Sequence, residues 1–165
     1  MRNQKLFPLG RLTEIIDLEK KKDLRIILAN GCFDLIHVGH VRYLKESKAL
    51  GDRLVVALNS DRSVHRLKGP GRPLMGESDR ADILAAFSAV DFVTVFDEDN
   101  VESVLLSLKP HIHAKGSDYT EETVPEREIV RSYGGKVAIT GGPKVRSTSD
   151  VFSDILLREA RDRSG

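Results

Sequence analysis

Short apolar runs alternate with longer segments of helical periodicity along this 165-residue chain, and that alternation constrains the fold more than any other feature. The runs are apolar throughout, as expected for strands that are covered on both faces. Strand–helix alternation is typical of a doubly wound parallel sheet with helices on both faces. We therefore expect an α/β fold with strands at residues 24–29, 53–59, 91–96, 111–115 and 136–140, and helices at 12–22, 40–50, 77–90, 101–108, 125–133 and 149–161.

Length and composition predict one domain, with an N-terminal helix in residues 1–23 and a Rossmann-like five-stranded core in residues 24–165. The formal net charge of +1 gives no support for nucleic-acid or membrane-surface binding. No apolar run approaches the roughly 20 residues that span a bilayer, and no stretch near the N-terminus has signal-peptide character. The single cysteine, Cys32, cannot form an internal disulfide, which fits a reducing cytoplasm.

Ligands of such sheets bind outside the carboxyl ends of the strands, at the point where the strand order reverses. The segments that follow the expected strands should therefore carry the function. These are residues 30–40, 59–72, 115–119 and 141–149.

The first of these segments contains the sequence NGCFDLIHVGH. His37 and His40 are three residues apart at the start of a helix, so their rings can share one side of a turn. Gly31 allows a tight turn or a close approach to a ligand, and Gly39 leaves room between the rings. The free N–H groups of the helix start favour an anion, and Arg42 follows as a nearby cation. This combination suits a polyphosphate.

Two other interpretations of the histidine pair are weaker. A zinc site would need more ligands, but the remaining histidines (His65, His111 and His113) lie in separate segments and Cys32 is the only cysteine. A purely structural pair is disfavoured because two histidines around a glycine at a strand-to-helix junction are poor core material.

A second anion-binding segment is expected near the end of the chain, where Arg146, Ser147, Thr148 and Ser149 precede the last helix. Hydroxyl groups and free N–H groups at a helix start can cradle phosphate. An ordinary helix cap would have a similar sequence, so this segment indicates a phosphate site only in combination with the histidine-containing segment at residues 30–40.

The sequence GCFDLIHVGH resembles the HxGH signature of the nucleotidyltransferase superfamily, and RSTS is similar to its second signature. The stretches NSD, RLKGPGRPL, ESDRADILAAFSAVD and KGSDY extend the resemblance across nearly the whole chain. They are similar to the bacterial D-glycero-β-D-manno-heptose 1-phosphate adenylyltransferases, which occur as separate chains or fused to a kinase. No kinase half is present in these 165 residues.

This resemblance implies that AMP is transferred from ATP to a sugar 1-phosphate, giving an ADP-sugar for lipopolysaccharide core biosynthesis and pyrophosphate. The acceptor phosphate is already ionised at neutral pH, so the enzyme has to position two anions and neutralise developing charge. Mg²⁺ bound with ATP, a cytoplasmic location, a homodimer, and no nucleic-acid or membrane partner are also implied. Asp34 could hold the metal through water.

The resemblance also implies roles for individual residues. His37, His40, Arg42 and Lys115 form the expected catalytic set, with His40 best placed for the charge of the transition state. The expected nucleotide and phosphate contacts are Gly31, Cys32, Phe33, Asp34, Arg80, Arg146, Ser147, Thr148 and Ser149. The expected acceptor contacts are Asn59, Asp61, Lys68, Asp118 and Tyr119. Cys32 is interpreted as a packing group, not a nucleophile.

Three rival functions remain open at this point. A cytidylyltransferase acting with CTP on glycerol 3-phosphate or a related polyol phosphate would use the same chemistry with a different base pocket. A nucleotide-binding module without catalysis is disfavoured because both signatures are intact together. A redox Rossmann domain is disfavoured because no G-x-G-x-x-G follows the first strand.

Overall fold

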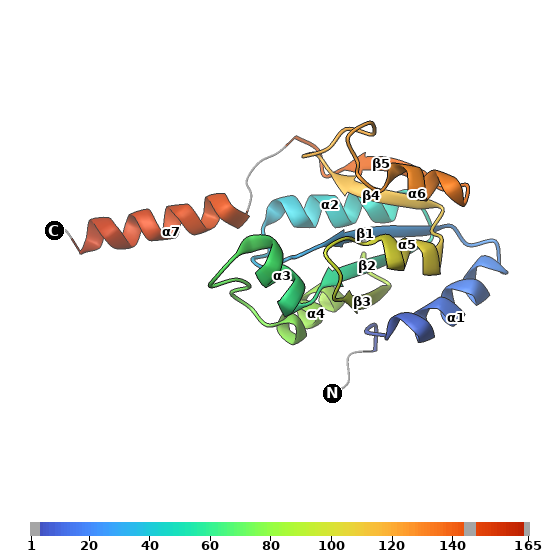
Figure 1. Cartoon of the computed structure of the whole chain (residues 1–165), viewed down its shortest axis with the longest axis horizontal. Helices are drawn as coiled ribbons and strands as arrows, with labels where there is room; N and C mark the ends of the chain where they lie inside the picture. Colours follow the sequence, from blue (N-terminus) through green and yellow to red (C-terminus); the bar gives the residue numbers. More distant parts are fainter. Residues whose placement is uncertain (1–3, 144–147, 164–165) are drawn as a thin grey trace.

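The computed structural model describes residues 4–143 and 148–163 and confirms the strand–helix alternation (Figure 1). All five expected strands and all six expected helices are present, and a further short helix, α3, joins them. The strands are β1 (Ile26–Gly31), β2 (Arg53–Asn59), β3 (Phe92–Phe96), β4 (Ile112–Gly116) and β5 (Lys136–Thr140). The helices are α1 (Leu9–Lys20), α2 (Val38–Ala49), α3 (Asp61–Lys68), α4 (Glu77–Ala86), α5 (Glu102–Leu108), α6 (Arg127–Ser132) and α7 (Thr148–Asp162).

The five strands form one parallel sheet in the order β3-β2-β1-β4-β5. β1 lies at the centre, where Ala29 pairs with Val56 of β2 on one side and with Ala114 of β4 on the other. The chain moves outward from β1 to β3 and then crosses back to β4, so the strand order reverses between β1 and β4. The loops that follow these two strands therefore diverge, and the fold predicts a ligand site between them.

Alternate residues of the central strands enter two separate hydrophobic cores. Ile27 and Ala29 of β1 pack with α2 and α4 on one face, whereas Ile26 and Leu28 pack with α1, α5 and α6 on the other. All four side chains are completely buried. Burial on both faces explains why β1 is apolar from Ile26 to Ala29, because polar side chains there would have no access to water.

One sequence prediction about the helices was wrong in detail, and one helix was not predicted. Residues 77–90 were expected to form one helix, but α4 ends at Ala86 because Phe87 takes an extended backbone and turns the chain toward β3. Residues 61–68, to which the sequence analysis assigned no element, form α3, which buries Val64 and leaves Leu67 exposed. The Ser60 hydroxyl caps this helix by accepting a hydrogen bond from Ser63 N at 3.1 Å.

α7 extends away from the body of the molecule, as Figure 1 shows, while its first turn stays near the carboxyl ends of the strands. Ile155, Leu156 and Leu157 of this helix are 46%, 50% and 59% exposed. Within residues 4–143 and 148–163, no helix combines the length and apolar character needed to cross a bilayer.

The Tyr43 hydroxyl of α2 joins the two strands on either side of the switch point. It donates a hydrogen bond to Ala114 O at 2.8 Å and accepts one from Asn30 N at 3.3 Å. Tyr43 is 8% exposed, so water cannot readily replace these bonds. Burial also raises the pKa of Tyr43 far above its usual value, which keeps the hydroxyl protonated as a donor.

We predict that Tyr43→Phe lowers the free energy of unfolding by about 1–3 kcal/mol, because two buried backbone groups lose their partner. Tyr133→Phe is the matched control, since the buried Tyr133 hydroxyl has no hydrogen-bond partner among the described residues. Urea denaturation measures both values. Equal losses in the two variants would contradict the role given to Tyr43.

Candidate active site

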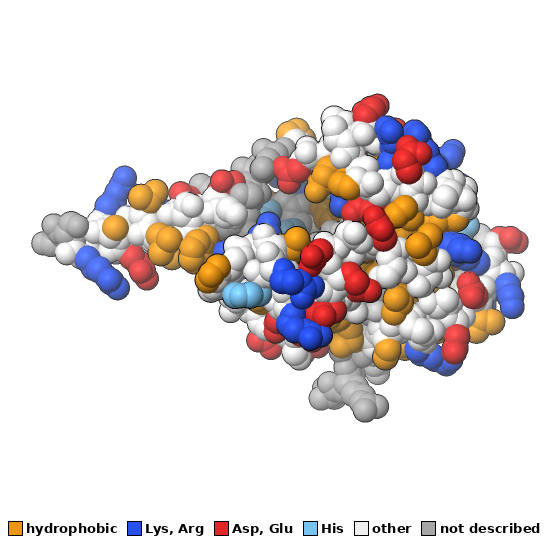
Figure 2. Space-filling view, viewed as in Figure 1, with side chains coloured by type: hydrophobic (Ala, Val, Ile, Leu, Met, Phe, Trp, Pro, Cys, Tyr) orange, Lys and Arg blue, Asp and Glu red, His pale blue; other side chains and the backbone are white. Residues whose placement is uncertain are grey.

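A cavity of about 370 Å³ opens at the switch point between the ends of β1 and β4. Its walls come from the loop after β1, the first turns of α2, the loop after β4, the end of β5, the residues around Lys68 and Arg72, and the start of α7. A hollow is visible on this side of the molecule where α7 leaves the body (Figure 2). The volume lies within the range of about 300–1,000 Å³ that is usual for small-molecule sites.

His37 and His40 meet in this cavity at the start of α2, with ring centroids 4.0 Å apart. His37 Nδ1 accepts a hydrogen bond from Gly39 N at 3.1 Å, and His40 Nδ1 accepts one from His37 N at 3.3 Å. A neutral imidazole carries its single proton on the nitrogen that is not accepting. Both Nε2 atoms are therefore N–H donors, and they lie at the positive end of the dipole of α2.

Desolvation keeps both rings neutral. It lowers the pKa of His40 to about 4, with a further contribution from the neighbouring His37, and it lowers the pKa of His37. Neutral donors cost less to hold in a partly buried site than charged ones. A bound polyanion would reverse this shift, because negative charge nearby favours the protonated ring.

The ring of Phe33 packs between His40 and Tyr43. Its backbone has the left-handed φ of 47°, which is uncommon for a bulky residue. This turn places its ring 5.1 Å from His40 and 6.4 Å from Tyr43, between centroids. The ring also passes close to Gly31, where an added Cβ would lie 3.1 Å from Phe33 Cε2. A side chain at position 31 would therefore press on the ring that holds His40.

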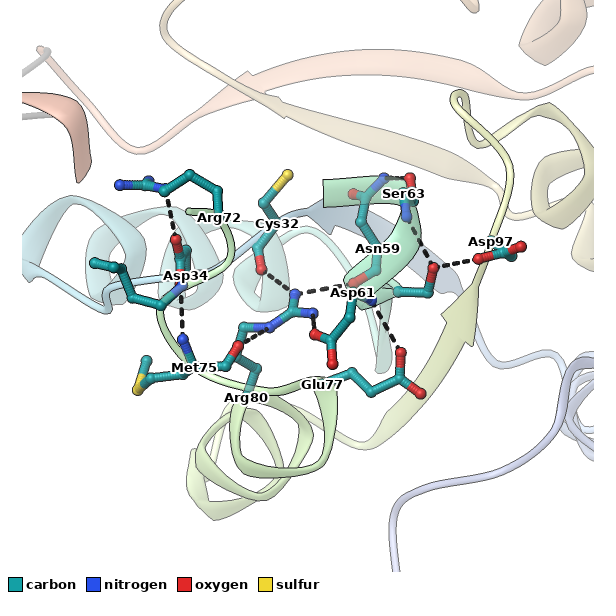
Figure 3. A network of polar contacts seen from close by, with 12 residues as sticks. Cys32, Asp34, Asn59, Asp61, Ser63, Arg72, Met75, Glu77, Arg80 and Asp97 are labelled. Carbon is teal, nitrogen blue, oxygen red and sulfur yellow. Dashed lines mark hydrogen bonds and ion pairs between the residues drawn. The ribbon is translucent and has the colours of Figure 1, made fainter. Parts of the chain in front are cut away.

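Asp34 also lines the cavity and contacts Arg72 and the chain at Met75, as Figure 3 shows. The carboxylate is 2% exposed, accepts hydrogen bonds from Leu74 N and Met75 N at 2.7 and 3.2 Å, and forms an ion pair with Arg72 at 2.9 Å. The guanidinium of Arg72 also lies 5.4 Å from the ring centroid of Phe152 in α7. Arg72 thus connects the loop after β1 to the last helix at the edge of the cavity.

Lys115 lines the wall at the end of β4 and is 7% exposed. Its ammonium lies 3.5 Å from Asn30 Oδ1, which also pairs with His113 Nε2 at 3.0 Å. Burial lowers the pKa of Lys115, and it lowers the pKa of His113 to about 3. His113 is therefore neutral and donates from Nε2 to the amide oxygen.

Arg80 does not reach the cavity, in contrast to the phosphate contact expected from the sequence. Its side chain is completely buried and donates to the backbone carbonyls of Met75, Cys32 and Asn59 at 3.0, 2.6 and 2.9 Å. Its remaining terminal nitrogen pairs with Asp61 at 2.8 Å. Arg80 therefore ties together the chain after β1, the chain after β2 and the loop before α4 (Figure 3).

Three further predicted residues also lie off the cavity lining. Asn59 is 4% exposed, and its amide nitrogen donates to Ser63 Oγ at 2.9 Å, so its polar groups serve α3. Asp61 pairs with Arg80 instead of facing an acceptor. Arg42 is exposed on α2, because a position two residues after His40 lies on another side of the helix.

The remaining predicted site residues either line the cavity or lie outside the described residues. The structure brings to the cavity Gly31, Cys32, Phe33, Asp34, His37, His40, Lys68, Lys115, Asp118, Tyr119 and Ser149. Arg146 and Ser147 lie outside the described residues, as does the side chain of Thr148. Burial raises the pKa of Cys32, so it stays a thiol and fits the packing role.

Sequence reasoning gave no individual role to several lining residues: Asn30, Arg72 and Ser117, which lie in the segments expected to carry the function, and Tyr43 and Thr140, which do not. A signal existed for Asn30, because a polar residue directly before Gly31 ends an otherwise apolar run. The sequence offered a weaker signal for Arg72 in the loop GPGRP. Tyr43 has no such signal, since a tyrosine on a helix is usually a packing residue.

The described residues hold no cluster of three or more His, Cys, Asp or Glu side chains arranged to bind a metal ion. Asp34, the carboxylate expected to approach a metal, is occupied by Arg72 and by two backbone N–H groups. The donor set of the cavity instead suits an anion: two imidazole Nε2–H groups, an ammonium and a helix start.

A parallel sheet with an imidazole pair and a helix start at its switch point suits the binding of the phosphates of a nucleotide. The model of the cytidylyltransferase-like family matches residues 28–152. The chain therefore belongs to this family of nucleotidyltransferases, as the HxGH resemblance predicted.

The chain is 50% identical over 147 residues to the bifunctional protein HldE of Pelobacter propionicus, covering 89% of this chain but 30% of that protein. HldE of Methylobacillus flagellatus is 52% identical over 128 residues, which is 78% of this chain and 26% of that protein. The chain thus spans about a third of the length of these curated relatives.

Two solved structures are also similar. The lipopolysaccharide core biosynthesis protein of Thermoplasma volcanium is 32% identical with a TM-score of 0.58, and the match covers 70% of this chain and 93% of that one. A pantoate–β-alanine ligase of Francisella tularensis has a TM-score of 0.61 at 15% identity, with 87% and 68% covered, and shows likeness of fold alone.

We predict that Arg80→Lys lowers the free energy of unfolding by about 2–4 kcal/mol. The planar guanidinium of Arg80 reaches three carbonyls and a carboxylate in different directions, and a single ammonium cannot contact all four. Arg66→Lys is the control, since Arg66 is exposed and pairs with Asp99 at the surface. Thermal and urea denaturation measure the difference. If both variants were equally stable, Arg80 would not stabilise the protein by connecting the segments after β1, after β2 and before α4.

Proposed function

We propose that this protein transfers AMP from ATP to D-glycero-β-D-manno-heptose 1-phosphate, giving ADP-heptose and pyrophosphate for lipopolysaccharide core biosynthesis. Two lines of similarity support the choice of substrate. The motifs RLKGPGRPL and KGSDY resemble those of heptose 1-phosphate adenylyltransferases. The similar protein from Thermoplasma volcanium is described as a lipopolysaccharide core biosynthesis protein.

The geometry of His37 and His40 carries the proposal. Two adjacent rings, both accepting backbone N–H groups at Nδ1, present two Nε2–H donors beside the start of α2. Rings fixed in this way lose little entropy when they bind phosphate oxygens, so the site is organised before ATP arrives.

In the reaction, a phosphate oxygen of the sugar phosphate attacks the α-phosphorus of ATP in line. A bond forms between that oxygen and the α-phosphorus while the bond to the bridging oxygen of pyrophosphate breaks. Negative charge grows on the α-phosphate and on the leaving group, and His40 and His37 donate hydrogen bonds to these oxygens. The acceptor is already an anion, so no side chain has to remove a proton.

Lys115 is proposed to bind an anionic oxygen on the β4 side of the cavity, with Asp118 and Tyr119 beside it and Lys68 across the mouth. ATP enters as its Mg²⁺ complex in this proposal, with the metal held by phosphate oxygens and water. That arrangement suits a cavity wall in which the Asp34 carboxylate is already occupied.

The cellular setting belongs to the same proposal. We propose a cytoplasmic enzyme, because its donor ATP is a cytoplasmic metabolite, and a chain that works as one nucleotidyltransferase domain with α1 packed on α5 and β3. We also propose a homodimer. Exposed apolar side chains on α7 support this (Figure 2), as does Leu18 of α1, which is 57% exposed.

The test pairs ATP and CTP with heptose 1-phosphate and glycerol 3-phosphate and measures pyrophosphate release. We expect turnover with ATP and heptose 1-phosphate, and a loss of about 100- to 1,000-fold in kcat for His40→Ala, the size expected when an electrostatic donor is removed. His65→Ala, on the exposed side of α3, is the control and should keep full activity. Turnover only with CTP and glycerol 3-phosphate would replace the proposal with its rival, and near-normal release by His40→Ala would refute the role of the ring.

A further inference from the structure

Lys115 is held in the cavity wall by contacts that are all long. Its ammonium lies 3.5 Å from Asn30 Oδ1, 3.6 Å from Glu126 Oε2 and 4.7 Å from the ring centroid of Tyr119. An ammonium has three N–H donors, and good charge-assisted hydrogen bonds are about 2.7–2.9 Å long. None of these three partners is close enough to make such a bond, so an incoming anionic oxygen can still gain a short one.

Glu126 is the only one of these partners with a formal charge, and it is itself buried. It is 6% exposed, it stands directly before α6, and it does not line the cavity. Its Oε2 atom has no hydrogen-bond partner among the described residues, so its ion pair with Lys115 is the polar contact that this atom makes. A buried carboxylate is costly unless a cation lies nearby, and the same is true of a buried ammonium.

We propose that Glu126 is a positioning residue of this active site, which keeps the Lys115 ammonium charged and directed at the cavity so that an anionic oxygen of the substrate completes its coordination. The nature of that anion rests on the proposed function. Glu126 itself stays behind Lys115 and touches no substrate.

The separation of 3.6 Å suits such a role better than a closer contact would. A short, bidentate pair would occupy the ammonium and compete with the substrate, whereas a carboxylate at this distance still provides attraction. Burial lowers the pKa of Lys115, and Glu126 opposes that shift. Without the carboxylate, desolvation would act alone and the lysine would lose its proton more easily.

The other titratable groups around Lys115 are the same residues in the wild type and in the Glu126 variants. His113 is neutral because burial lowers its pKa to about 3, and burial keeps the Tyr43 hydroxyl of α2 protonated. Tyr119 and Asp118 in the loop after β4 are present in every variant. A difference between variants therefore reports the charge at position 126.

The direct test is an NMR titration of the lysine side chains in the full chain between about pH 6 and 11, with the Lys115 signal assigned through Lys115→Arg. We expect Glu126→Gln to lower the pKa of Lys115 by about 1 unit, as expected when an opposite charge within 4–6 Å is removed. Glu128→Gln is the matched control, because Glu128 is exposed on α6 and pairs with Arg127 and Arg131. An unchanged Lys115 titration in folded Glu126→Gln would overturn the proposal.

Enzyme assays give the second readout. In Glu126→Gln, the alkaline limb of the kcat/KM profile should move to lower pH by the same amount as the pKa of Lys115. Glu126→Asp keeps the negative charge, so its profile should lie close to that of the wild type. A purely structural role would lower the yield or stability without moving this limb. If Glu126→Gln does not fold, Glu126→Ala takes its place in the NMR test: a lower Lys115 pKa supports the proposal, and an unchanged pKa contradicts it.

The two proposals fail in different ways. If the wild-type chain releases no pyrophosphate with any substrate pair, the proposed function fails, while the NMR titration still decides the role of Glu126. If pyrophosphate is released but the lysine titration is the same in both proteins, only the role of Glu126 is lost.

Discussion

Two backbone N–H groups at the start of α2 determine what the active-site histidines can do. Because Gly39 N and His37 N each donate to an Nδ1 atom, both rings have a fixed orientation and a fixed proton position. The helix start thereby presents two side-chain donors at the positive end of its dipole. This arrangement lets a nearly neutral protein bind a highly charged ligand, since the chain has a formal net charge of only +1.

The strand order decides where that arrangement lies. The loops after β1 and β4 diverge at the switch point, and each wall there contains a cation paired with a buried carboxylate: Arg72 with Asp34, and Lys115 with Glu126. Such pairs hold cations in place without making the cavity strongly positive. Three segments are connected by the buried guanidinium of Arg80, which donates to carbonyls of the chain after β1, the chain after β2 and the loop before α4 (Figure 3).

The sequence predicted the parallel sheet and the histidine pair because both depend on local patterns. Apolar runs identify strands that are covered on both faces, and the spacing of His37 and His40 fixes their relation on one helical turn. The role of Arg80 could not be predicted, since its four partners come from segments that meet only in the folded chain. Glu126 was missed for the same reason, because nothing in the sequence around residue 126 indicates that its partner lies at the end of β4.

The most direct test of this account is the tautomer and the pKa of the two rings, measured by long-range ¹H–¹⁵N NMR on the full chain without ligand. The account predicts that His37 and His40 are both neutral at pH 7 with the proton on Nε2, and that His40 stays neutral until the pH falls to about 4. A proton on Nδ1, or a His40 pKa near the ordinary value of about 6.5, would contradict it.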